Sequence, residues 1–252
     1  MTSATSTSTT LTPLRPPSLS PSLNPSLNPL LSPLLRRLTG DEKHEPSALS
    51  TLDVLWVLYD RVLAVNPAHP DDPDRDRFLL SKGHGPAAFY AVLAAKGFFP
   101  ADWLDDLGGA SSRLGHHPDR LLVPGVEIGS GSLGHGLGLA VGTALGLRAR
   151  PATHGRRPRV VVLLGDAELD EGSNHEAIAY AGATGLGGLT AVVVDNASAT
   201  HGWPGGVAAR FTLAGWTART VDGHDHDALE AALRAAEPER PHAVVAVVEK
   251  KG

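Results

Sequence analysis

Two short apolar runs limit most strongly what this chain can fold into. Residues 159–166 (RVVVLLGD) and residues 189–196 (LTAVVVDN) are continuous and rich in valine. Such runs are typical of central strands in a parallel sheet that is covered on both faces. The segment between them contains NHEAIAYAGATG (174–185), which predicts the crossover helix of a βαβ unit.

The alternation of helices and strands continues on both sides of this unit. Further helices are expected at 48–63, 85–99, 133–150 and 227–237, and later strands within 216–225 and 242–249. The expected fold is therefore α/β, with a doubly wound, mostly parallel sheet and helices on both faces. Ligands of such sheets bind outside the carboxyl ends of the strands.

Residues 1–36 differ in composition from the rest of the chain. A Ser/Thr-rich start is followed by PSLSPSLNPSLNPLLSPLL, in which proline recurs every four residues. Proline at this spacing blocks helix formation, so we expect a disordered leader over 1–36 and one globular domain over 37–252. The leader is interpreted either as a tether or targeting segment or as a dispensable extension, and it lacks the apolar core of a secretory signal.

Composition excludes several classes of protein. The net charge of -5 argues against a nucleic-acid groove or a basic membrane-binding surface. The absence of cysteine excludes a disulfide scaffold, a thiolate nucleophile and a cysteine-bound zinc. Because no apolar run reaches the roughly 18 residues of a membrane span, a soluble, cytoplasmic protein is expected.

The polar endings of the two valine-rich runs predict a binding edge. Asp166 ends the first run and Asn196 ends the second. Neighbouring parallel strands would bring both side chains to one edge of the sheet. With a backbone carbonyl from the next loop, they would form the all-oxygen ligand set that Mg²⁺ accepts together with phosphate oxygens. The alternative is that Asp166 only caps the helix that follows.

These residues resemble the thiamine-diphosphate motif of the transketolase family, which begins Gly-Asp-Gly and ends in Asn. Here the motif begins Gly165-Asp166-Ala167-Glu168 and ends in VVVDN. Four more segments resemble the family in the same order: DRFLLSKGHGPAAFYAVL (76–93), GHHPD (115–119), PGVEIGSGSLGHGLGLAVG (124–142) and FTLAGWTARTVDGHD (211–225). The resemblance runs from about residue 40 to the C-terminus and implies the thiamine-diphosphate-binding fold.

The resemblance also implies the residues of a cofactor site. Asp166, Asn196 and the backbone carbonyl of Ser198 would bind Mg²⁺, which bridges the two phosphates of thiamine diphosphate. The cofactor itself would contact His84, Gly131, Ser132, Leu133, Gly165, Ala167 and Asn196. Two of these positions depart from the family, because Ala167 replaces a glycine and Ser132 replaces a proline. A positive φ at Ala167 would cost of order 1 kcal/mol.

Two histidines are implied as catalytic residues. His117, in GHHPD, would face the hydroxyl groups of the substrate. His44 lies in KHEPS, where the family has Gly-His-Pro-Gly. Because Pro46 fixes φ where the family has a flexible glycine, an altered substrate pocket is expected even if His44 keeps its acid–base or orienting role.

The family site also needs a glutamate from a separate pyrimidine-binding domain, and these 252 residues contain no such domain. The chain therefore resembles the N-terminal subunit of a split transketolase. It is expected to form a homo- or hetero-oligomer with a C-terminal subunit, with the cofactor at their interface. Glu171 would either face that glutamate or stabilise the start of the next helix.

The function implied is transfer of a two-carbon ketol unit between sugar phosphates. Alternatives are a deoxyxylulose-phosphate-synthase-like or 2-oxoacid-processing subunit, and a non-catalytic cofactor-binding subunit. Retention of His84 and His117 favours the transketolase branch over the oxoacid dehydrogenases. A nicotinamide-binding Rossmann domain is disfavoured because the spaced glycines of GSGSLGHGLG do not open a βαβ unit.

Overall fold

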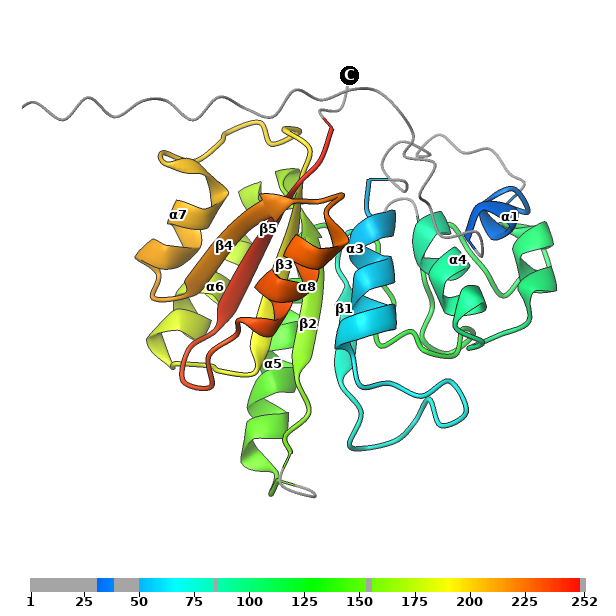
Figure 1. Ribbon diagram of the computed structural model, residues 1–252, viewed down its shortest axis with the longest axis horizontal. Coiled ribbons are helices and arrows are strands. Elements are labelled where there is room, and N and C mark those ends of the chain that lie inside the picture. Colours follow the sequence, from blue (N-terminus) through cyan, green and yellow to red (C-terminus); the bar gives the residue numbers. More distant parts are fainter. Residues whose placement is uncertain (1–30, 39–49, 84–85, 153–155, 250–252) are drawn as a thin grey trace, which may run out of the picture.

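A parallel sheet of five strands forms the centre of the protein, seen in a computed structural model that describes residues 31–38, 50–83, 86–152 and 156–249 (Figure 1). The strands lie in the order β1-β2-β3-β5-β4. Their bounds are β1 Arg77–Leu80, β2 Val160–Gly165, β3 Leu189–Asp195, β4 Thr217–Asp222 and β5 His242–Val247. Every pair of neighbouring strands is parallel, which confirms the predicted fold class.

Helices cover both faces of this sheet. The longer ones are α3 Leu52–Val57, which continues as the π-helical turn η1 Leu58–Val62, α4 Ala87–Ala95, α5 His135–Ala149, α6 Gly172–Ala183, α7 Gly206–Leu213 and α8 His226–Arg234. The short ones are α1 Leu31–Leu35 and the 3₁₀ turns η2 Ala101–Asp106 and η3 Ala167–Asp170. No helix in the described ranges combines the length and the apolarity needed to cross a membrane.

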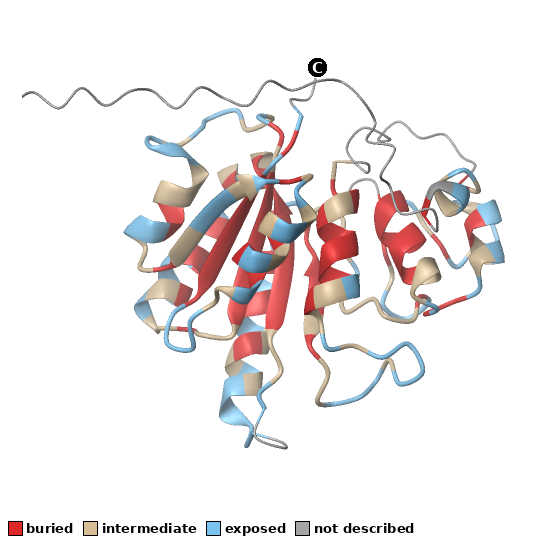
Figure 2. Cartoon of the chain, in the orientation of Figure 1, coloured by how far each residue is buried: buried red, intermediate tan, exposed pale blue. Residues whose placement is uncertain are grey.

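Two apolar cores lie on the two faces of the sheet. Figure 2 shows β2, β3 and β5 mostly buried between them, whereas the edge strand β4 is partly exposed. Because successive strand residues point to opposite faces, Val161 and Leu163 pack with α3, α4 and α8, whereas Val162 and Leu164 pack with α5, α6 and α7. This double burial explains why β2 and β3 read as continuous apolar runs in the sequence.

Two features differ from the sequence-based expectation. Strand β1 was not predicted, since its four residues are too few to show a periodicity. Residues 31–35, inside the predicted leader, form α1, whose buried Leu31 belongs to the same core as α4. Arg37 then binds both carboxylate oxygens of Asp105 at 2.8 and 2.7 Å. The remainder of the leader, residues 1–30, lies outside the described residues.

A hydrogen-bonded cluster joins α3 to the turn before α8 and to the segment after β5. The His224 ring contacts Asp53 on α3 through Nδ1 at 2.8 Å and Glu249 through Nε2 at 3.0 Å. Nε2 of His226 contacts the second carboxylate oxygen of Asp53 at 2.7 Å. Hydrogen bonding to Asp53 raises the pKa of His224 to about 9. Burial opposes ionisation of Asp53, but its bonds from the two histidines prevail and lower its pKa.

This cluster predicts a pH-dependent stability. A histidine whose pKa is raised in the folded state stabilises the protein fully below its unfolded pKa of about 6.5, and loses that contribution as the pH rises through about 9. We expect the urea midpoint of the wild type to fall over this range. The variant His224→Gln should be less stable at pH 6.5 and should have a flatter profile.

The matched control is His69→Gln, on an exposed loop. It should keep the wild-type slope. Parallel profiles for the wild type and His224→Gln would show that the His224 ion pairs do not contribute to stability.

Candidate functional site

The carboxylate of Asp166 receives three hydrogen bonds from the loop that follows β3. Asp166 is the residue directly after β2 and is only 2% exposed. Its oxygens accept from the backbone N–H of Ser198 at 2.6 Å, from the Ser198 hydroxyl at 2.7 Å and from the N–H of Ala199 at 2.9 Å. The structure therefore joins the ends of β2 and β3, as the two sequence runs predict.

A second acid extends this attachment along the same loop. Asp170, at the end of η3, accepts hydrogen bonds from the backbone N–H groups of Thr200 at 3.1 Å and His201 at 3.3 Å. Between Asn196 and Ser198 the chain turns through Ala197, which has a φ of +55°. This left-handed conformation costs an alanine of order 1 kcal/mol, and it directs the following N–H groups back toward Asp166.

Asn196 supplies an unpaired oxygen at this edge. The residue is 6% exposed, and its Oδ1 atom has no hydrogen-bond partner among the described residues. An amide oxygen buried without a partner costs about 1–3 kcal/mol, so its retention suits a site in which a ligand completes it. The Asp166 carboxylate still has acceptor capacity, since its two oxygens offer about four lone-pair directions for three bonds. These residues fit an Mg²⁺ ion.

The described residues contain no group of three or more His, Cys, Asp or Glu side chains placed to hold a metal. The ligand set proposed from the sequence has a single carboxylate, so it would not form such a group. An ion bound there would need further oxygens from the backbone and from a phosphorylated ligand, as Mg²⁺ commonly has in proteins.

Glu168 is a buried residue of this edge that the sequence interpretation did not assign. It is 1% exposed and accepts hydrogen bonds from the hydroxyl of Ser81, from the N–H of Gly134 at 3.0 Å and from the N–H of Gly165 at 3.4 Å. Burial raises the pKa of Glu168, although these bonds act in the opposite direction. This one carboxylate joins the ends of β1 and β2 to the start of α5.

The second wall of the site consists of loops that pack backbone to backbone. His117 Nδ1 lies 2.9 Å from the Gly83 carbonyl oxygen. A Cβ on Gly83 would lie 2.6 Å from the Gly131 nitrogen, and a Cβ on Gly131 would lie 2.9 Å from the His117 ring. Glycine is therefore required where these three segments meet. Ser132 and Leu133 follow on the exposed side of the same loop.

The remaining predicted site residues are Gly165, Ala167, His44 and His84. Gly165 is buried at the end of β2, as expected. Ala167 begins η3 without a positive φ, because Ala197 is the non-glycine residue with that conformation in the described part of the chain. The strain considered for Ala167 is therefore absent. His44 and His84 lie outside the described residues.

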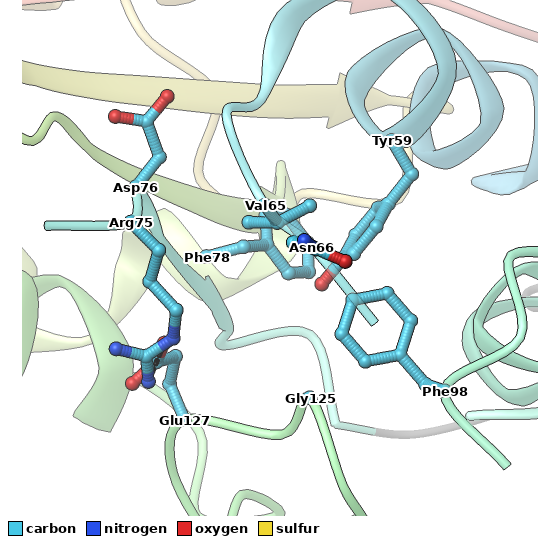
Figure 3. A pocket seen from close by; sticks show the side chains of 9 residues that line it. All are labelled: Tyr59, Val65, Asn66, Arg75, Asp76, Phe78, Phe98, Gly125 and Glu127. Atoms are coloured by element: carbon cyan, nitrogen blue, oxygen red, sulfur yellow. Dashed lines mark ion pairs between the residues drawn. The ribbon is translucent and has the colours of Figure 1, made fainter. Parts of the chain in front are cut away.

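A cavity near the opposite end of the sheet is not a candidate site. It lies beside the start of β1, where Arg75 and Glu127 form an ion pair of 2.7 Å (Figure 3). Its volume of about 10 Å³ has room for roughly one water molecule. Buried Asp76, which precedes β1, is bound by Arg156 and Arg159, so this end of the sheet is closed by ion pairs.

Comparison with known proteins agrees with this arrangement. The family described as "Transketolase, thiamine diphosphate binding domain" matches residues 39–249. A Rhodococcoides fascians protein named Ferredoxin fas2 is 54% identical over 215 residues, which are 85% of this chain and 70% of that protein. The 6-deoxy-6-sulfo-D-fructose transketolase subunit SqwG of Clostridium sp. is 35% identical, over 77% of this chain and 71% of that one.

Solved structures give the same result for the fold. Transketolase from Leishmania mexicana superposes with a TM-score of 0.74 at 28% identity, over 86% of this chain. The matched part is 35% of that enzyme, so this chain spans about a third of its length.

The fold and the matched residues define a thiamine-diphosphate-binding α/β domain. The chain belongs to the transketolase family and corresponds to its N-terminal part.

The position of Glu168 predicts a large effect on stability. Glu168→Ala would leave the Ser81 hydroxyl and two backbone N–H groups buried without their acceptor. At about 1–3 kcal/mol for each group, we expect the free energy of unfolding to fall by about 3 kcal/mol or more. Urea denaturation measures this loss.

Two further variants test whether the loss of stability comes from the buried carboxylate. Glu168→Gln keeps an acceptor oxygen and should lose about half as much. Asp170→Ala, at a partly exposed position, should lose about 1 kcal/mol. Equal losses for Glu168→Ala and Asp170→Ala would contradict a special role of the buried carboxylate.

Proposed function

We propose that this chain binds thiamine diphosphate through Mg²⁺ held by Asp166, Asn196 and the backbone carbonyl of Ser198. The observation that carries this proposal is the buried Oδ1 of Asn196, which has no hydrogen-bond partner in the described part of the chain and lies beside the loop that Asp166 binds. With a C-terminal partner subunit, the chain would transfer a two-carbon ketol unit between sugar phosphates.

Each part of the chain would have a distinct task in this reaction. Bound thiamine diphosphate supplies the nucleophilic thiazolium carbon of ketol transfer. The backbone N–H of Ala167 would contact the diphosphate, and the backbone of Gly131, Ser132 and Leu133 would line the ring side of the cofactor. His84 would contact the diphosphate region, and His44 would act on the substrate.

The geometry of His117 supports a role in orienting the substrate. A carbonyl oxygen only accepts hydrogen bonds, so the contact with Gly83 requires the proton on Nδ1. In the neutral ring, Nε2 is then the acceptor nitrogen. Glycine at position 131 allows the backbone to approach this ring closely, and the contact with the Gly83 carbonyl fixes one of its nitrogens.

The outer face of α5 and α6 supports the proposal of a partner subunit. These helices pack together, and they expose Leu139 by 38% and Tyr180 by 50%. On α5 the positions of Gly138, Gly142 and Gly146 have open space around them. The glycines would let another chain approach α5 closely. Exposed apolar side chains that lie together commonly mark interaction sites. SqwG carries the name of a transketolase subunit, which agrees with a divided enzyme.

The name of the Rhodococcoides relative suggests a different activity, electron transfer by an iron–sulfur cluster. Clusters of ferredoxins are held by cysteine thiolates. These 252 residues contain no cysteine, so that chemistry does not extend to this chain. Other thiamine-diphosphate reactions would use the same Asp166 site, and activity measurements with different substrates distinguish them.

The metal assignment predicts the binding behaviour of the cofactor. Calorimetry should detect thiamine diphosphate binding in the presence of Mg²⁺ and should show its loss on addition of EDTA. Because Asp166 would be a direct ligand, Asp166→Ala should weaken binding by more than about 100-fold. Asp222→Ala is the matched control, since Asp222 is an exposed acid at the end of the parallel strand β4. Binding that persists after both EDTA and Asp166→Ala would remove the support for the metal.

The divided site predicts activity only on reconstitution. The chain alone should not transfer ketol units from a ketose phosphate to ribose 5-phosphate, and adding the C-terminal subunit should restore turnover. His117→Ala should lower kcat by about 100-fold through lost orientation while the cofactor still binds. Leu139→Asp should instead raise the concentration of partner needed for half-maximal activity.

Two neighbours serve as controls in the same titration. His116→Ala changes the exposed histidine beside His117, and Leu213→Asp changes an exposed leucine on α7. Both should behave as the wild type. Full activity of the chain alone would contradict the divided enzyme, and inactivity with the partner present would favour a non-catalytic subunit.

A further inference from the structure

The hydroxyl of Ser130 is buried without a hydrogen-bond partner among the described residues. Ser130 directly precedes Gly131, in the loop that leads to α5. Its backbone N–H donates to the carbonyl of Pro118 at 3.2 Å, so its main chain is fixed while its side chain lacks a bond. A buried hydroxyl in this condition loses its bonds to water without replacing them, which destabilises the fold.

Ser81, a second serine in the same site, illustrates a structural role. The Ser81 hydroxyl donates to Glu168 and accepts from the N–H of Gly136 at 2.9 Å. Both hydrogen-bonding capacities of Ser81 are used inside the protein. Ser130 is partly exposed as a residue, but its hydroxyl oxygen is buried, and the described protein atoms use neither capacity of this hydroxyl.

The surroundings of Ser130 place its hydroxyl in the wall of the site described above. A Cβ on Gly83 would lie 2.8 Å from the Ser130 oxygen and 2.6 Å from the Gly131 nitrogen. The hydroxyl therefore belongs to the same wall as His117 and Gly131, on the side assigned above to the cofactor. The loop from Ser81 to Gly83 connects this wall to Glu168 and the end of β2.

We propose that the Ser130 hydroxyl forms a hydrogen bond with bound thiamine diphosphate, on the side of the cofactor that Gly131 lines. This inference rests on the proposed function and adds a side-chain contact to it. Ser130 is then a cofactor-binding residue, and its hydroxyl gains a hydrogen-bond partner when the cofactor binds.

The test compares the stability of the free chain with its affinity for the cofactor. Ser130→Ala removes an unpaired hydroxyl, so the free variant should melt at the wild-type temperature or above it. Its Kd for thiamine diphosphate with Mg²⁺ should be about tenfold weaker, or about 1.4 kcal/mol. The matched variant Ser81→Ala loses two hydrogen bonds and should melt at a lower temperature. Calorimetry and thermal melting are measured on the full chain, with the C-terminal subunit present where binding requires it.

Four results would overturn the inference. A free Ser130→Ala variant that is destabilised like Ser81→Ala would show a structural serine. An unchanged Kd in Ser130→Ala, with binding lost in Asp166→Ala, would reject the Ser130 contact and leave the proposed function intact. An unchanged Kd with a raised KM for the sugar would assign the hydroxyl to the substrate. Absence of cofactor binding in the wild type with its partner would reject the proposed function and this inference together.

Discussion

The candidate site depends on hydrogen bonds from backbone N–H groups to the carboxylates that follow β2. Asp166 and Asp170 bind the loop after β3, and Glu168 binds the residue directly before α5. Bonds to charged acceptors are worth about 1.5–3 kcal/mol, more than neutral ones. Acids that look like a concentration of surface charge in the sequence therefore fix the relative positions of three strand ends and the start of α5.

The sequence predicted the sheet, and the polar edge at which a site is proposed, because both follow from local patterns. Strands β2 and β3 are long enough to show burial on both faces, and their polar endings place Asp166 near Asn196. The role of Glu168 could not be read in this way, since its partner Ser81 is far away in the sequence. Its signal was an acid flanked by apolar residues, three residues after the end of β2. The close packing of Gly83 against Gly131 likewise depends on tertiary contact alone.

The two ends of the sheet use charge differently. At the carboxyl end the acids bind backbone N–H groups, and the amide oxygen of Asn196 has no partner among the residues that the structure describes. At the amino end Asp76 is neutralised by arginines, and the cavity beside it is small. A saturated ion-pair network closes one end, whereas incomplete pairing leaves the other able to accept a ligand. The unpaired groups thus indicate the functional end better than the shape of the surface does.

In the proposed metal site, the left-handed turn at Ala197 would have a consequence for the choice of cation. The loop around it is held by five N–H or O–H bonds to Asp166 and Asp170, so it has little freedom to expand. Calcium requires longer bonds, of about 2.3–2.6 Å, and more ligands than magnesium, which takes six at about 2.0–2.1 Å. A rigid loop that supplies few ligands would therefore bind the larger calcium ion less favourably than magnesium. Selection by ionic radius would then arise from backbone hydrogen bonding, without any additional side chain.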